Sequence, residues 1–162
     1  LNFTMPFTPF HMGPGVLIKS LLQGSFSLLI FGFTQVLMDL QPLFSIITGV
    51  GKLHGFSHTY IGATLIAVMS GLSGKYIFDF IFKYQKMNIY FSWKITFISA
   101  FIGSFSHILL DSIMHSDMIP FYPFNLSNNL LHLISNQHLH DFCLFTGVIG
   151  FLIYQLMKKY KQ

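Results

Sequence analysis

The chain has 162 residues, of which 52% are hydrophobic and only 9% are charged, whereas charged residues make up about 25% of a typical soluble domain. All nine basic residues are Lys, so the net charge of +4 arises without Arg, and the chain has no Glu. This balance argues against a soluble domain and favours a membrane protein. No nucleic-acid partner is expected, because Arg and aromatic stacking platforms are missing.

We expect a single domain over residues 1–162, because no repeat, linker or low-complexity segment divides the chain. Cys143 is alone, which excludes an intrachain disulfide and a CxxC site. No secretory signal peptide is expected, since no basic stretch precedes an apolar core and prolines interrupt residues 6–14. Met5 is a second candidate for the native start, beside Leu1.

Apolar segments in the first half of the chain predict an all-α membrane bundle of about four to five helices. The first, at 15–23, follows Pro14, which suits a first helical turn, and it is short for a membrane span. The second, at 26–40, is expected to end before Pro42. The third, at 57–72, is expected to end at Gly71 and Gly74, before a short amphipathic piece at 75–84.

Two further helices are predicted in the second half. The fourth, at 92–115, is long enough to cross a membrane. The stretch IPFYPFNLSNN at 119–129 is rich in Pro and Asn and is expected to be irregular. The fifth helix, at 141–157, is followed by KKYKQ.

If each helix reverses the direction of the chain, the polar residues of these segments fall at one end of the bundle. They are His11, Asp39, His54, His58, His107, Asp111, His115, His138, His140 and Asp141. The opposite end carries Lys75, Lys83, Lys86, Lys94, Lys158, Lys159 and Lys161, with Lys52 as the exception. The positive-inside rule places the Lys end in the cytoplasm and the His/Asp end outside.

Neutral His and ionised Asp are suitable ligands for Zn²⁺ and similar divalent ions. His107, Asp111 and His115 have the spacing i, i+4, i+8, so they form one stripe on a helix. Asp111 is the expected bridge between two ions, because a carboxylate can bridge and an imidazole cannot. The expected metal ligands are His11, Asp39, His54, His58, His107, Asp111 and His115, enough for two or three ions.

Each of these motifs has a simpler interpretation. An H-x-x-x-D pair on a helix is most often a surface pair or a buried hydrogen bond. Asp39 can mark a helix end, and His11 can cap a turn. The H-x-x-x-H pattern at 54–58 lacks the Glu of the HExxH protease signature. The convergence of all these residues at one end of a weakly charged chain outweighs the simpler interpretations.

The remaining polar residues carry weaker signals. Asp79 is expected to pair with Lys75 or Lys83 at i, i+4, and His132 is expected in the core. Two roles stay open for the residues His138, His140 and Asp141. They are either outer partners that orient the metal ligands, or polar residues of the membrane interface.

Four segments resemble a known family: MPFTPFHMGPG (5–15), TQVLMDLQPL (34–43), HGFSHTYIGA (54–63) and SHILLDSIMHSDMIPFYPF (106–124). They are similar to the bacterial membrane-bound metal-dependent hydrolase family, of the LexA-regulated inner-membrane protein type, over about residues 5–150. The metal-site pattern of that family is itself similar to zinc-dependent phospholipase C and P1-type nucleases, which are helical proteins with a trinuclear zinc cluster.

The resemblance implies a first set of ligands made of His11, Asp39, His54, His58, His107 and Asp111. His115 and Asp117 also match the family block. Gly55 stands where family members often have Arg. With no Arg in the chain, only Lys52 or the metal ions are left to hold an anionic group.

We therefore expect a metal-dependent hydrolase of the bacterial inner membrane, with its site on the extracytoplasmic side. The expected substrate is a phosphoester or lipid, attacked by a metal-activated water that Asp39 or Asp117 orients or deprotonates. The loop at 119–129 is either a lip over the site or part of an aromatic belt.

Two other classes stay open. One is a metal-binding or transport protein without hydrolysis; a transporter should carry polar residues through the whole membrane depth, whereas here they gather at one end, which favours a surface-facing site. A structural membrane protein with a degenerate site should contain no metal after purification.

Overall fold

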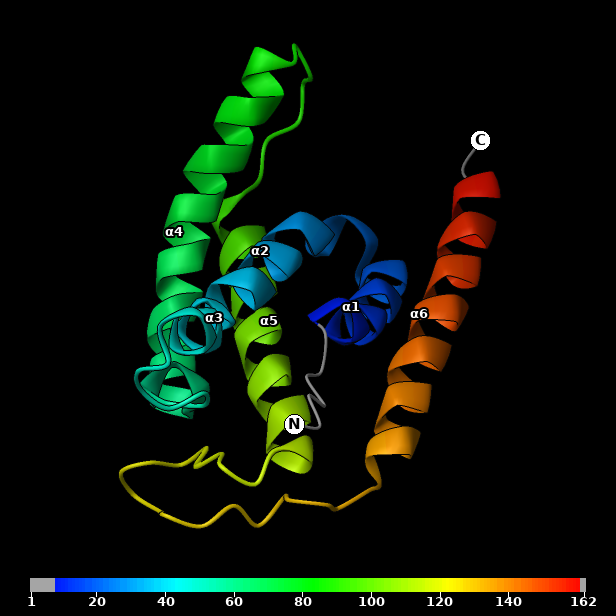
Figure 1. Ribbon diagram of the computed structural model, residues 1–162. Helices are drawn as coiled ribbons and strands as arrows, with labels where there is room; N and C mark the ends of the chain where they lie inside the picture. Colours follow the sequence, from blue (N-terminus) through cyan, green and yellow to red (C-terminus); the bar gives the residue numbers. More distant parts are fainter. Residues whose placement is uncertain (1–7, 161–162) are drawn as a thin grey trace.

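The computed structural model describes residues 8–160, and within them the chain is helical and contains no strand (Figure 1). The elements are α1 (Thr8–Leu22), α2 (Leu28–Met38), α3 (Leu40–Thr48), α4 (Tyr60–Tyr84), α5 (Trp93–Met114) and α6 (Asn136–Lys159). The expected all-α class is confirmed. The expectations on the native start and on Lys161 lie outside the described residues.

Four helical stretches are long and apolar enough to cross a membrane: Leu28–Thr48, Tyr60–Tyr84, Trp93–Met114 and Asn136–Lys159. Large apolar side chains on them face outward, such as Ile47 at 74% and Phe80 at 70% exposure. Outward apolar surface of this extent is typical of helices that face lipid. The chain therefore has the features of a membrane protein. The 15-residue helix α1 is not among these stretches.

Helix α1 begins seven residues earlier than the predicted 15–23, so the expected start is wrong. Pro14 lies inside the helix and not in its first turn. The reason is a close contact with α6, made by glycines. A Cβ atom at Gly13 would lie 1.9 Å from the carbonyl oxygen of Cys143, and one at Gly150 would lie 2.5 Å from the amide nitrogen of Leu17. His11 is consequently a helical residue.

The predicted helix at 26–40 is divided at Asp39, which joins α2 to α3. The chain changes direction there (Figure 1). The predicted end before Pro42 is wrong. Pro42 lies in the first turn of α3, where a missing N–H costs no hydrogen bond, so the helical stretch continues through it. The left-handed Gly49, with φ 69°, ends α3 instead.

Helix α4 runs without a break through Gly71 and Gly74, so the predicted end at 72 is wrong and the piece at 75–84 belongs to the same helix. A Cβ atom at Gly71 would lie 2.8 Å from the ring of Phe97, and one at Gly74 would lie 3.0 Å from Ile30. These glycines allow neighbouring helices to approach closely, which is a common use of small residues in membrane helices.

Helix α5 agrees with the predicted 92–115 to within one residue at each end. It is the most buried of the four candidate spans and packs against α2 and α4, while α1 packs along α6 (Figure 1). Its buried face carries His107 and Asp111. His115 is the C-cap in an extended conformation, so the helical stripe contains only the first two of its three predicted members.

Helix α6 begins at Asn136 and not at 141, because Ser135 caps it by accepting a hydrogen bond from the amide of His138 at 3.2 Å. The connection from 115 to 135 is irregular, as predicted, and passes across the end of α5 (Figure 1). His132 lies in this connection and is exposed, with φ 56°. Its expected place in the core is wrong, because the apolar run around it is loop and not helix.

The C-terminal ends of α4 and α6 lie at the opposite end of the molecule from the 115–135 connection (Figure 1). They carry Lys83, Lys158 and Lys159, as expected. The Nζ atom of Lys75 lies 2.6 Å from Oδ2 of Asp79, which confirms one of the two pairs predicted for Asp79.

Candidate metal centre

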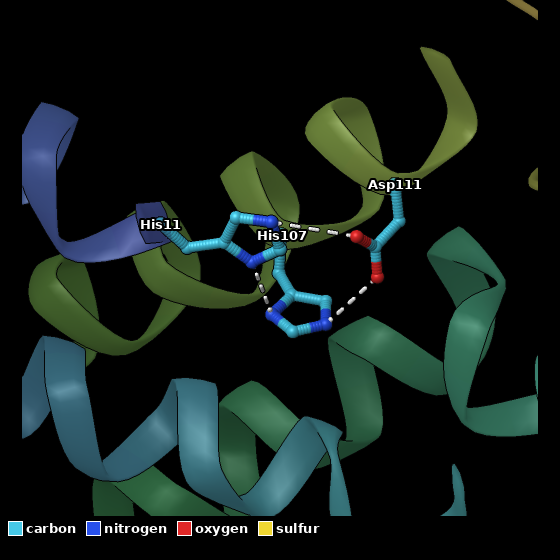
Figure 2. A group of neighbouring side chains, drawn as sticks. All are labelled: His11, His107 and Asp111. Carbon is cyan, nitrogen blue, oxygen red and sulfur yellow. Dashed lines mark hydrogen bonds and ion pairs between the residues drawn. The ribbon is translucent and has the colours of Figure 1, made fainter. Parts of the chain in front are cut away.

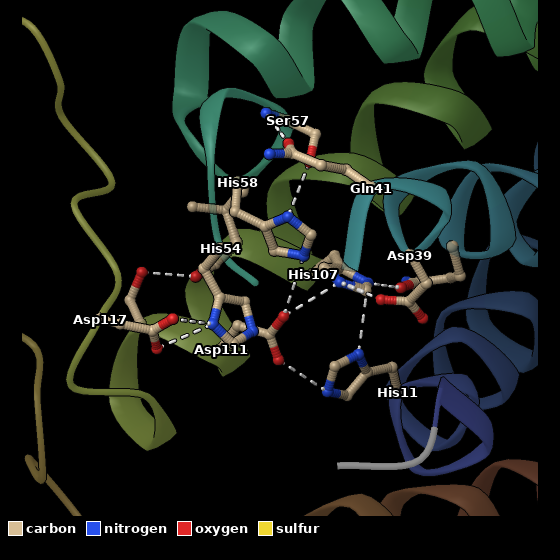
Figure 3. Close-up of polar contacts among 12 residues, drawn as sticks. His11, Asp39, Gln41, His54, Ser57, His58, His107, Asp111 and Asp117 are labelled. Carbon is tan, nitrogen blue, oxygen red and sulfur yellow. Dashed lines mark hydrogen bonds and ion pairs between the residues drawn. The ribbon is translucent and has the colours of Figure 1, made fainter. Parts of the chain in front are cut away.

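Eight His and Asp side chains from four parts of the chain meet at one place. Figure 3 labels all of them except His115. Their ligand atoms form four overlapping groups, and within each group all atoms lie within 4.8 Å of one another. The groups are His11–His107–Asp111, Asp39–His58–His107, His54–His58–Asp111 and His54–His115–Asp117. The structure therefore brings together every residue for which the sequence predicted a metal-binding or catalytic role.

Asp111 lies at the centre of this cluster, and its side chain is almost completely buried. Its Oδ1 atom is 3.4 Å from Nε2 of His11 (Figure 2). Its Oδ2 atom is 3.0 Å from Nε2 of His107 and 3.5 Å from Nε2 of His58. The two carboxylate oxygens thus face different imidazoles, which is the arrangement that a bridging carboxylate requires.

Four buried atoms of the cluster have no hydrogen-bond partner within residues 8–160: Nε2 of His58, His107 and His115, and Oδ1 of Asp111. Nε2 of His58, Nε2 of His107 and Oδ1 of Asp111 each lie 3.0–3.5 Å from a polar atom of the cluster, but without the geometry of a hydrogen bond. Buried polar atoms are normally paired, because an unpaired one costs about 1–3 kcal/mol. Two ligands of a tetrahedral Zn²⁺ ion, each about 2.0–2.1 Å from it, are about 3.3 Å apart. The distances from the Asp111 oxygens to the three Nε2 atoms, 3.0–3.5 Å, match that value, so these groups can hold a metal ion.

Gln35 fixes the orientation of the His107 ring. Its Nε2 donates to the carbonyl oxygen of Gly103 at 3.2 Å, so Oε1 faces His107 and accepts from Nδ1 at 2.5 Å. This assigns the proton of the neutral ring to Nδ1 and leaves the lone pair of Nε2 directed at Asp39 and Asp111. Metal-binding His residues are usually held in this way by an outer partner. Sequence reasoning missed Gln35, although it precedes Asp39 by one helical turn.

Ser57 and Gln41 hold His58 in a similar way (Figure 3). Oγ of Ser57 lies 2.9 Å from Nδ1 of His58, and the amide of Ser57 donates to Oε1 of Gln41 at 2.9 Å. A Cβ atom at Gly55 would lie 1.9 Å from Nε2 of Gln41. A side chain at position 55 would therefore displace the Gln41 amide that holds Ser57.

Asp117 contacts His54 on the outer side of the cluster. Nδ1 of His54 lies 2.8 Å and 2.9 Å from the two carboxylate oxygens of Asp117, so that Nδ1–H donates to them. Nε2 of His54 is then free to bind metal beside the stacked ring of His115, whose centroid is 4.3 Å away. The geometry makes Asp117 an orienting partner of His54.

Three imidazoles of the cluster, those of His11, His58 and His115, are held in the neutral form that binds metal. Burial lowers the pKa of His11 to about 4 and that of His58 to about 3, against the opposing effect of the Asp111 carboxylate. Burial also lowers the pKa of His115. Burial alone would raise the pKa of Asp117, but the charge and hydrogen bond of His54 lower it by more, so the net shift of the pKa is downward. Lone pairs are thus available at pH 7.

The three residues left open at the start of α6 lie outside all four groups. Nδ1 of His138 is 2.8 Å from Oγ of Ser135, and Asp141 accepts from Gln137 at 3.0 Å. The ring of His140 lies 5.0 Å from that of Phe10. These contacts are local to the start of α6 and its contact with α1. Over residues 8–160, every possible metal group belongs to the one cluster.

No protein-family model, curated protein or solved structure matches this chain. The fold and the cluster define a helical protein of membrane type that can hold a metal ion among buried His and Asp side chains.

Proposed function

We propose that the chain is a metal-dependent hydrolase of phosphoester or lipid substrates, of the kind found in the bacterial membrane-bound hydrolase family that its motifs resemble. The observation that carries the proposal is the buried Asp111 carboxylate, whose oxygens face His11, His58 and His107 at 3.0–3.5 Å without hydrogen-bond geometry. A cluster of unpaired ligand atoms is costly unless a cation satisfies it.

The donor set favours Zn²⁺, because most of its atoms are imidazole nitrogens. One ion would be held by His11 and His107 and a second by His54, His58 and His115, and the Asp111 carboxylate would serve both groups of ligands. Bound zinc supplies an acidified water and stabilises negative charge that develops on phosphorus.

The chain's own acids have distinct places around this centre. Asp39 lies at the joint of α2 and α3, with Oδ1 3.2 Å from Nε2 of His107 and its side chain one-third exposed. It is therefore open to solvent and can accept a proton from the attacking water. In the reaction, water oxygen bonds to phosphorus, the ester P–O bond breaks, and the leaving alkoxide takes up a proton. Asp117 orients His54 and does not act as the base.

The cluster end is proposed to face the extracytoplasmic side of the bacterial inner membrane. The Lys residues at the ends of α4 and α6 support this orientation by the positive-inside rule. The gathering of all metal groups at one place supports a fixed site over an ion pathway through the membrane.

The proposal is tested with full-length protein purified in detergent without chelators. Hydrolysis of bis(4-nitrophenyl) phosphate, 4-nitrophenyl phosphate and phospholipids is measured before chelation, after it, and after zinc is added back. We expect turnover that chelation abolishes and zinc restores, that Asp111→Asn lacks, and that Asp141→Asn retains. Metal-loaded protein that cleaves none of these esters would refute the hydrolase assignment.

A further inference from the structure

A cavity of about 530 Å³ opens beside the metal centre, between the segment before α4 and the 115–135 connection. We propose that it binds a membrane lipid with an anionic phosphate head group. The walls include Lys52, Leu53, Asp117, Ile119, Leu126 and Leu131. The assignment of this lipid as substrate rests on the proposed function, but the binding itself does not.

The cavity leads toward the metal cluster. A smaller cavity of about 200 Å³ shares Lys52, Asp117 and Ile119 with it and also contacts His54 and Tyr122. His54 belongs to two of the four possible metal groups. A head group in these cavities would therefore lie next to the metal-binding imidazoles.

Lys52 supplies the charge that recognises an anion. Its carbonyl oxygen accepts from Oγ of the buried Ser45 at 3.0 Å, which fixes the backbone at the cavity. Lys52 is an exposed residue at the rim of the cavity, and within residues 8–160 its ammonium group makes no ion pair. The Asp117 carboxylate lines the same cavity and is half exposed, and both of its oxygens accept from Nδ1 of His54. An unpaired ammonium in a cavity matches a phosphate, which Lys binds as a point charge.

The walls favour a lipid over a soluble phosphoester. Five of the nine lining side chains are apolar, and the same connection exposes Phe121 at 47% and Phe124 at 87%. Exposed aromatic residues are typical of the membrane–water boundary. One cation beside apolar walls fits a phosphate head group followed by acyl chains. A soluble phosphoester would leave the apolar walls without a partner.

Native mass spectrometry of the detergent-purified chain tests this, with a non-hydrolysable phosphonate analogue of dioleoylphosphatidic acid as the probe. Dioleoylglycerol has the chains without the phosphate, and glycerol 3-phosphate has the phosphate without the chains. We expect the phosphonate lipid to bind at least about tenfold more tightly than dioleoylglycerol, which lacks the charge pair with Lys52. We expect a similar difference from glycerol 3-phosphate, which lacks the chains that bury the apolar walls.

The variant Lys52→Gln is expected to weaken binding of the phosphonate lipid about tenfold at unchanged metal content. Leu126→Asp, at a side chain 69% exposed, is expected to weaken it through charge repulsion without disturbing the core. Lys94→Gln, at the start of α5, is the matched control and should bind as wild type.

Equal binding by wild type and Lys52→Gln would overturn the inference even if the chain proves to be a hydrolase. Tighter binding of glycerol 3-phosphate than of the lipid would also overturn it, by assigning the cavity to a soluble ligand. Lysine-dependent lipid binding in a chain without hydrolytic activity would support the inference and refute only the proposed reaction.

Discussion

Gln35 and His107 are 72 residues apart in sequence, yet their side chains share a buried hydrogen bond of 2.5 Å. The amide oxygen accepts from Nδ1, so Nε2 of the same ring faces Asp111 at 3.0 Å. Gln35 thereby sets which nitrogen of His107 can bind a cation.

Replacing Gln35 with Leu should weaken metal binding about 10- to 100-fold, because an outer partner of a metal-binding His is lost. Gln35→Glu keeps an acceptor for Nδ1 and should retain most of the affinity. Zinc affinity, measured by competition with a chromogenic chelator, checks both variants. Val36→Ala, on the exposed side of the same helix, is the control. Equal affinities for Gln35→Leu and wild type would show that Gln35 only fills space.

Asp117→Asn should reduce the metal content of the chain by about one ion and leave the rest in place. The substitution weakens the hydrogen bond that orients His54, whereas the group of His11, His107 and Asp111 does not involve Asp117. Metal content per chain after dialysis is the measurement. If Asp117→Asn lost all of its metal, or none of it, the result would contradict a centre with two metal positions that can be emptied separately.

Gly13→Ala should lower the free energy of unfolding by about 1–3 kcal/mol, because its Cβ would overlap the carbonyl oxygen of Cys143 and force α1 away from α6. Since α1 carries His11, the variant should also bind metal less tightly. Thermal unfolding in detergent measures the first effect. Gly24→Ala is the control, since no atom lies within 4 Å of the added Cβ. Similar melting temperatures for the two variants would argue against the close contact.

The sequence was most informative where hydrophobicity and ligand spacing coincide. Helix α5 is long and predominantly apolar, so its limits and the helical pair His107 and Asp111 can be predicted from the sequence. The approach of His11, Asp39 and His58 to this pair could be expected only from the assumption that each helix reverses direction. The structure brings these residues together without α1 qualifying as a span.

The helix boundaries went wrong at Pro and Gly residues whose effect depends on tertiary contacts. The sequence predicts a helix start at Pro14 and a helix end at Gly71 and Gly74, but each of these residues lies inside a helix that close packing stabilises. The outer partners Gln35 and Ser57 carry no charge and form no recognised motif, so only their hydrogen bonds to imidazoles reveal their role.

The metal content of wild type and of Asp111→Ala tests the central claim most directly. Both proteins are purified in detergent without chelators and examined by inductively coupled plasma mass spectrometry, with Asp79→Ala as the control at the opposite end of the bundle. We predict at least about one zinc per chain in wild type and in the control, and a marked loss in Asp111→Ala. Wild type and Asp111→Ala that are equally free of metal would contradict a metal centre at this cluster.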